Sequence, residues 1–168
     1  MTVDDLNALD EPAARDALTA CCAAPGWVTR MLRARPCLAP AAVLDAADAA
    51  CRELSAEEWR AAIAQHPRIG ESHADGASAR ERAWSAGEQS LARTAGESTR
   101  AALARGNTEY EARFGQRFII CATARSAEEM LAALRARLSH DRAAELAVTA
   151  EELRKITRLR LEKLLAER

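Results

Sequence analysis

The sequence predicts an all-α protein, and three observations lead to this prediction. Hydrophobic residues make up 49% of the 168-residue chain, but much of that share is alanine, a strong helix former. Aromatic residues are few (three Trp, one Tyr and two Phe), and the β-branched residues that sheets favour are scarce. Capping-box patterns recur ahead of periodic apolar stretches. We therefore expect residues 1–168 to form a single domain of about eight helices.

Helix starts and stops follow one another closely in the first third of the chain. Thr2 with the acidic residues after it predicts an N-cap. Residues 12–22 and 26–34 are helical in pattern and are separated by Pro25-Gly26. Pro40 suits a first helical position and predicts a helix to about Leu54. The capping box Ser55-Ala56-Glu57-Glu58 begins the next helix, which ends at His66-Pro67.

Further helices are expected in the rest of the chain, with one extended segment between them. Capping boxes at 78–81 and 126–129 predict helices to about Ala92 and Leu138. Residues 97–113 are helical in pattern with an interruption near Gly106-Asn107, and 142–166 hold one or two helices, with Thr149 able to cap the second. Residues 70–77 are typical of a loop. Residues 118–122 are the one β-leaning run, too short for a sheet, and predict an extended buried connector.

Charge, cysteine content and hydropathy exclude several classes of protein. The formal net charge is −1 with mixed signs, and no basic block or aromatic platform predicts nucleic-acid binding. No apolar run predicts a membrane span, and no secretion signal or peroxisomal tripeptide is evident, so a cytoplasmic location is expected. The five cysteines have no CxxC spacing and are expected to be small buried hydrophobes, with neither disulfides nor a zinc site.

The stretch Gln65-His66-Pro67-Arg68-Ile69-Gly70-Glu71 differs in composition from the rest of this alanine-rich chain, because it combines a histidine, a proline, an arginine, a glycine and a carboxylate. Pro67 biases His66 away from helical backbone angles, so the imidazole is expected at a helix end. Gly70 permits a turn that other residues resist. This arrangement leaves two alternatives open: an acid–base histidine beside a ligand, or a histidine that only stabilises a helix C-terminus.

Other polar groups with helical spacing could join such a site. Ser85, Glu88 and Gln89 fall on one helix face, which is either a ligand-binding face or an ordinary solvated one. In the last helix Arg154, Arg158 and Arg160 alternate with leucines, and the sequence leaves open which arginine turns inward. His73 and His140 need only solvated or helix-end roles, and the three histidines lack metal-ligand spacing.

Taken together, these motifs resemble those of one known family. The chain contains His66-Pro67-Arg68-Ile69-Gly70, Ser85-x-x-Glu88-Gln89, Tyr110-x-x-Arg113-Phe114-Gly115-x-x-Phe118-Ile119-Ile120 and Glu152-Leu153-x-Lys155-Ile156-x-x-x-Arg160-Leu161. In this order they resemble OHCU decarboxylase, in full 2-oxo-4-hydroxy-4-carboxy-5-ureidoimidazoline decarboxylase. The N-terminal third contributes helical pattern only. Arg113 stands where the family commonly has lysine.

The resemblance implies a carboxy-lyase of urate degradation that forms (S)-allantoin and CO2 from OHCU. It implies an all-helical homodimer that requires no cofactor and no metal. His66 takes the position of the catalytic histidine, and Glu88 is expected to orient it or the ureido group. The substrate-contacting positions fall on Pro67, Ser85, Gln89 and Arg160 and on backbone groups of Ile119, Ile120 and Cys121.

Two other functions remain compatible with these residues. One is a catalytically silent helical module that binds a ureide or a partner protein through the same pocket. The other is a lyase or hydrolase for another ureide or a hydantoin, because polar pocket residues recognise amides generically.

Overall fold

The computed structural model describes residues 1–71 and 78–166, and all regular structure within those ranges is helical. The ten helices there are α1 (Val3–Ala8), α2 (Glu11–Cys21), α3 (Pro25–Arg33), α4 (Pro40–Arg52), α5 (Ala56–Gln65), α6 (Ala79–Glu88), α7 (Ser90–Arg93), α8 (Glu97–Phe114), α9 (Ala127–Arg137) and α10 (Arg142–Ala166). The all-α prediction is confirmed. The count exceeds eight partly because the helix expected from 78 to 92 is divided at Gln89 into α6 and the four-residue α7. Most of the loop expected at 70–77, including His73, lies outside the described residues.

The helix starts have the local chemistry that the sequence predicts. Thr2, Ser78 and Ser126 each accept a hydrogen bond from the N–H three residues on, and the carboxylate there accepts the cap's own N–H. Ser55 and Glu58 form the same reciprocal pair, with N–O distances of 3.2 and 2.8 Å. Each pair satisfies N–H groups that the first helical turn leaves without partners, so these starts are fixed locally.

Tertiary packing decides the continuity of two helices, one against the sequence prediction and one that the sequence left open. No interruption occurs at Gly106-Asn107, and α8 is continuous through both residues. A Cβ added at Gly106 would lie 2.8 Å from Cδ2 of Leu134 on α9, so the glycine allows close helix packing. The region 142–166 is one helix, and Thr149 is a fully buried residue in its interior rather than a cap.

The chain divides into two compact units, and the divisions fall within α5 and α10. Unit 1 comprises Met1–Ala62 and Arg154–Arg168, and unit 2 comprises Ile63–Leu153. In unit 1, α3 packs against α2 and α4, and the fully buried Trp27 donates its indole N–H to the Ala47 carbonyl at 3.2 Å. The expectation that residues 1–168 behave as a single domain stays a prediction.

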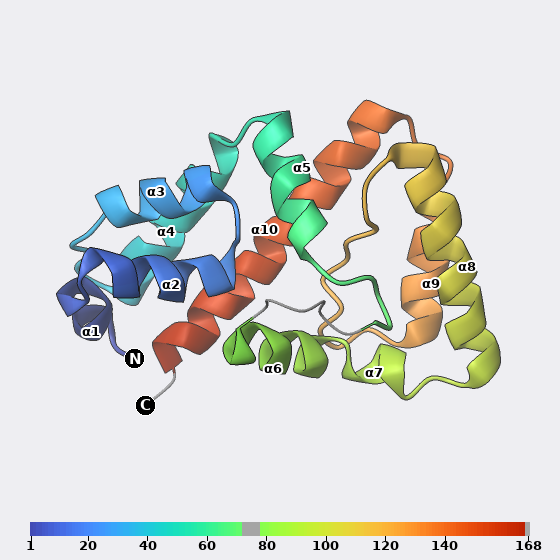
Figure 1. Ribbon diagram of the computed structural model, residues 1–168, viewed down its shortest axis with the longest axis horizontal. Coiled ribbons are helices and arrows are strands. Elements are labelled where there is room, and N and C mark those ends of the chain that lie inside the picture. Colours follow the sequence, from blue (N-terminus) through green and yellow to red (C-terminus); the bar gives the residue numbers. More distant parts are fainter. Residues whose placement is uncertain (72–77, 167–168) are drawn as a thin grey trace. The chain divides into compact units, whose positions relative to one another are not determined.

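Unit 2 is built around α8 and α9, which lie side by side (Figure 1). Its core contains the buried side chains of Tyr110, Phe118, Met130 and Leu134. The Tyr110 ring centroid lies 5.2 Å from that of Phe118 in an edge-on contact. Residues 117–122 contain no helix or turn, and Phe118, Ile119 and Ile120 are buried, as expected for an extended connector. Among the described residues, no helix is both long and apolar enough to cross a membrane.

Candidate active site

His66 lies directly after the last residue of α5, as the proline that follows it predicts. Its N–H donates to the Ile63 carbonyl at 3.1 Å, which closes the last turn of the helix. Arg117, at the start of the connector, donates a guanidinium N–H to the His66 carbonyl. Both His66, at 7% exposure, and Pro67 are buried. The imidazole is therefore attached to a backbone that is held from two sides.

The turn after His66 is fixed by two amide side chains from other helices. The buried Asn107 of α8 donates to the Ile69 carbonyl at 3.2 Å. Gly70 has a φ of +89°, a conformation that side chains resist, and its N–H donates to Oε1 of Gln89 at 2.9 Å. The histidine segment is thereby joined to the C-terminal end of α6.

The end of α6 presents the three polar residues that the sequence places on one face. Ser85 and Gln89 are 5% and 6% exposed, and the Gln89 amide lies 3.4 Å from Oγ of Ser85. Glu88 is half-buried. Residues on a solvated helix face would be exposed. The burial of Ser85 and Gln89 therefore shows that these two residues do not belong to such a face.

The connector carries its own set of side-chain contacts. Arg137 donates to the Ile119 carbonyl at 2.7 Å, and the Cys121 N–H donates to Glu152 at 2.8 Å. Burial raises the pKa of the Cys121 thiol, and the carboxylates of Glu152 and Glu88 raise it further. The Glu88 carboxylate of α6 thus lies near enough to the Cys121 thiol to act on it electrostatically.

Arg160 is the arginine of the last helix that turns inward. It is 3% exposed, and its guanidinium lies 3.4 Å from the Ala20 carbonyl. Arg154 and Arg158 instead pair with Asp48 at 2.6 and 3.1 Å. All five of these residues belong to unit 1, whereas His66, α6 and the connector belong to unit 2. The part of Arg160 in a substrate site stays a prediction.

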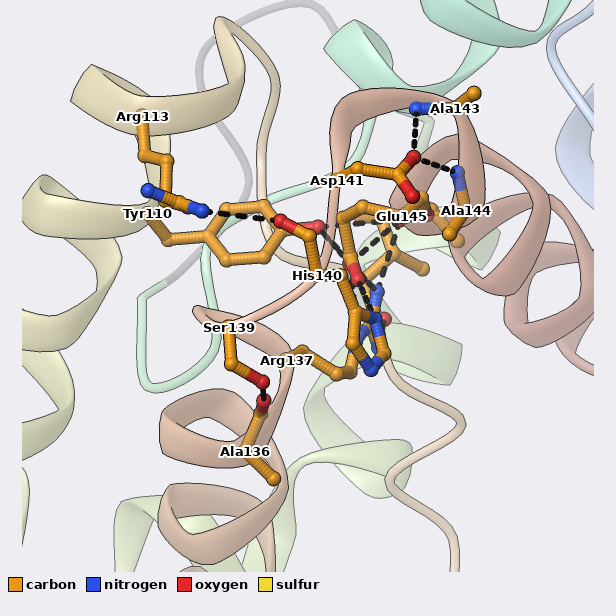
Figure 2. Close-up of polar contacts among 12 residues, drawn as sticks. Tyr110, Arg113, Ala136, Arg137, Ser139, His140, Asp141, Ala143, Ala144 and Glu145 are labelled. Carbon is orange, nitrogen blue, oxygen red and sulfur yellow. Dashed lines mark hydrogen bonds and ion pairs between the residues drawn. The ribbon is translucent and has the colours of Figure 1, made fainter.

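Sequence reasoning missed a buried ionic network in unit 2. Figure 2 shows Arg137, Tyr110 and His140 gathered around Glu145, which is fully buried. Nε of Arg137 lies 2.8 Å from Oε1 of Glu145, Nδ1 of His140 lies 2.7 Å from Oε2, and the Tyr110 hydroxyl donates to the same carboxylate. Burial raises the pKa of Glu145, but hydrogen bonds from Arg137 and Tyr110 outweigh burial and hold it below its ordinary value. His140 thus has a buried carboxylate partner, beyond the helix-end role that the sequence suggested.

The sequence contains no pattern that predicts this network. Arg137 and Glu145 are eight residues apart, on two helices joined by a short turn, so no helical spacing links them. Each one alone is typical of a solvated helix face. Among the described residues, no group of three or more histidine, cysteine or acidic side chains is placed to hold a metal ion. All five cysteines are free, and four of them are buried.

Comparisons with known proteins point to one family. The chain is 33% identical over 149 residues to the uric acid degradation bifunctional protein TTL of Arabidopsis thaliana, an alignment that covers 88% of this chain and 46% of that one. It is 42% identical over 62 residues to 2-oxo-4-hydroxy-4-carboxy-5-ureidoimidazoline decarboxylase of Amia calva, covering 37% of this chain and 35% of that one. Each alignment thus covers less than half the length of the curated relative.

Solved structures give the same result. The crystal structure of an OHCU decarboxylase in the presence of (S)-allantoin matches with a TM-score of 0.78 and 29% identity, covering 90% of this chain and 99% of that one. An (S)-allantoin synthase structure shares the fold, with a TM-score of 0.73 at 16% identity over 98% of this chain and 54% of that one. The OHCU decarboxylase family profile matches residues 7–162. With nearly the whole chain matched, this protein belongs to the OHCU decarboxylase family.

Proposed function

We propose that this protein decarboxylates OHCU to (S)-allantoin and CO2 without a cofactor, as a carboxy-lyase of urate degradation. The observation that carries the proposal is the convergence of three segments within unit 2. The His66 turn is hydrogen-bonded to Gln89 at the end of α6 and to Arg117 at the start of the connector. The proposed reaction is the one after which the matched family is named.

The substrate's chemistry explains why positioned polar groups are enough. OHCU carries its carboxylate on a carbon that also bears a hydroxyl and adjoins an imine-like carbon. When the C–CO2 bond breaks, its electron pair flows toward that C=N unit, whose nitrogen takes up a proton. The hydroxyl proton is then lost as the carbonyl of allantoin forms, and a proton is added to the neighbouring carbon. The net reaction consumes one proton, and no external electron sink is required.

In this proposal His66 is the acid–base group. An imidazole changes protonation near neutral pH, which suits transfer from the substrate hydroxyl or to one face of the new stereocentre. Glu88 orients the imidazole or the ureido group. Ser85 and Gln89 hold ring and ureido amides, and Pro67 shapes the approach to His66. Backbone groups of Ile119, Ile120 and Cys121 meet the substrate, and Arg160 binds a carbonyl or carboxylate oxygen.

The assembly proposed with this activity is a homodimer acting in the cytoplasm on a small-molecule substrate. Size-exclusion chromatography with light scattering measures the dimer directly, as twice the 18.2 kDa chain mass.

The experiment that tests the activity follows the chirality of the product. Freshly generated OHCU decays by itself to racemic allantoin, so circular dichroism distinguishes the catalysed from the spontaneous reaction. The protein should accelerate OHCU loss and produce an optically active solution of (S)-allantoin. Unchanged decay with a racemic product would refute the proposal. In that case binding of (S)-allantoin or hydantoin, or turnover of another ureide in a substrate panel, would identify the alternative functions.

A further inference from the structure

Ile120 lies between two peptide groups that buried side chains hold in place. The Ile119 carbonyl, in the peptide before Ile120, accepts from Nη1 of Arg137 at 2.7 Å. The Cys121 N–H, in the peptide after it, donates to Oε2 of Glu152 at 2.8 Å. Arg137 is 6% exposed and Glu152 is 8% exposed, so both side chains that make these contacts are buried. Because a peptide group is planar, fixing one of its atoms largely fixes the direction of the other.

Those two contacts determine where the remaining atoms of the two peptides point. In a trans peptide the carbonyl and the N–H point in opposite directions, so the Ile120 N–H points away from Arg137 and the Ile120 carbonyl away from Glu152. In extended backbone the N–H and C=O of one residue point to the same side, as along the edge of a sheet. Ile120 therefore presents a hydrogen-bond donor and an acceptor together.

This donor and acceptor belong to a buried residue. Ile120 is 4% exposed, yet neither its N–H nor its carbonyl is hydrogen-bonded to another described residue of unit 2. More than nine in ten buried backbone groups in native proteins are paired. A cis ring amide or the terminal amide of a ureido group offers one N–H and one C=O side by side and so matches the pair that Ile120 presents.

We infer that Arg137 and Glu152 are positioning residues, which orient the Ile120 N–H and carbonyl toward an amide or ureido group of the substrate. This inference rests on the proposed function for the identity of the substrate. Arg137 is itself held in place by Glu145 and by Oγ1 of Thr149, 2.8 Å from Nη2. A guanidinium on the Ile119 carbonyl also polarises that peptide and strengthens the Ile120 N–H as a donor.

The sequence offers a direct probe of this peptide. Ile119-Ile120 is the only pair of adjacent isoleucines in the chain. In protein labelled with [1-13C,15N]-isoleucine, an HNCO spectrum contains a single cross-peak, from the Ile119 carbonyl and the Ile120 N–H. The carbonyl shift reports the contact with Arg137, and the amide shifts report binding of a ligand at Ile120.

The test compares Arg137→Lys with Arg142→Lys. Lysine keeps a positive charge near Glu145 but lacks the planar donor fork that reaches two partners. Arg142 is the matched control, because its Nη1 also donates to a backbone carbonyl in unit 2, that of Phe114 at 3.0 Å, outside the connector. In Arg137→Lys we expect a changed carbonyl shift without ligand, a weaker response of the Ile120 amide to (S)-allantoin, and a loss of about 10–100-fold in kcat/KM for OHCU. Arg142→Lys should retain all three.

A second pair of variants covers the case in which Arg137→Lys fails to fold. Glu152→Gln keeps an oxygen that accepts the Cys121 N–H, whereas Glu152→Met removes it. Glu152→Gln should respond to (S)-allantoin as the wild-type protein does, and Glu152→Met should not. Helical circular dichroism identifies the folded variants.

The outcomes separate this inference from the proposed function. If the Ile120 amide does not respond to (S)-allantoin in the wild-type protein, or responds equally in Arg137→Lys and Glu152→Met, the positioning role is wrong. If the wild-type protein does not accelerate OHCU decay, the proposed function fails. Under that result, a response to (S)-allantoin or hydantoin that depends on Arg137 would still establish Ile120 as an amide-binding position.

Discussion

The N–H of Gly70 donates to Oε1 of Gln89 at 2.9 Å, across nineteen residues of sequence. This contact joins the turn that follows His66 to the helix end that carries Ser85 and Glu88. Replacing Gln89 with alanine removes both this bond and the 3.4 Å contact with Ser85. We expect the free energy of unfolding to fall by about 1 kcal/mol and KM for OHCU to rise by about tenfold. Steady-state kinetics and urea unfolding measure the two effects.

The control for that variant is Gln65→Ala, which removes an exposed glutamine side chain at the end of α5. Its kinetics should match those of the wild-type protein. An unchanged KM in Gln89→Ala would show that Gln89 stabilises the turn without contributing to substrate binding.

Exchange of His66 for asparagine tests the acid–base role most directly. Asparagine retains polar character but cannot transfer a proton at neutral pH. Positioned acid–base catalysis contributes about 10²–10⁴-fold, so we expect kcat to fall by at least about 100-fold. Helical circular dichroism should be unchanged, because the His66 backbone contacts do not involve the imidazole. Turnover near the wild-type rate would remove His66 from the mechanism.

The ion pair between Arg68 and Glu111 should make stability depend on acid pH. Two hydrogen bonds, of 2.8 and 2.7 Å, join the guanidinium to the carboxylate. They hold the pKa of Glu111 below its ordinary value of 4.5. A carboxyl group with a lowered folded-state pKa contributes stability above its unfolded-state pKa, and the contribution is lost as pH falls through the folded value.

Glu111→Gln should therefore lower Tm at pH 7 by about 1–3 °C, since both partners are partly exposed and such pairs contribute about 0.2–1 kcal/mol. The Tm difference should narrow as pH falls from 4.5 through the lowered folded-state pKa of Glu111, because protonation of the wild-type carboxyl then removes the ion pair. Thermal melts across this range measure it, with the exposed Glu109→Gln on the same helix as control. A Tm difference between Glu111→Gln and the wild-type protein that does not change with pH would argue against the ion pair.

Two helical glycines should respond in opposite directions to alanine. At Gly106 the new Cβ would lie 2.8 Å from the fully buried Leu134 side chain, so we expect a loss of about 1–3 kcal/mol. At Gly87 of α6 nothing lies within 4 Å of the new Cβ, so the better helix propensity should stabilise the protein by about 0.5–1 kcal/mol. Urea unfolding of the two variants measures both. Equal effects would mean that helix propensity alone decides stability at these positions.

The sequence predicts those parts of the fold that depend only on contacts between residues within one helical turn. The capping boxes are correct because cap and carboxylate are three residues apart and meet wherever the helix packs. The burial of Ser85 and Gln89 involves the distant Gly70, and their spacing alone favoured a solvated helix face. The resemblance to a family implies a substrate-binding face at this point, and the structure shows that both side chains are buried.

Other features could not be predicted because their partners are distant in sequence. Gly106 looks like a helix interruption until Leu134 is placed against it. Thr149 looks like a cap until Tyr110, Arg137 and Glu145 surround it. The spacing of the last arginines does not reveal which one is buried, and the structure selects Arg160.

The pairing of Arg137 with Glu145 also affects how this sequence can diverge. Losing either partner alone leaves the other as an uncompensated buried charge, which typically costs about 3–5 kcal/mol. The free energy of unfolding of a natural protein is only about 5–15 kcal/mol in total. A lineage that changes one of the two positions therefore passes through a severely destabilised protein. The two positions should therefore be retained together or replaced together among descendants of this sequence. Because the same guanidinium holds the Ile119 carbonyl, such a paired replacement would also have to supply a new donor for the connector.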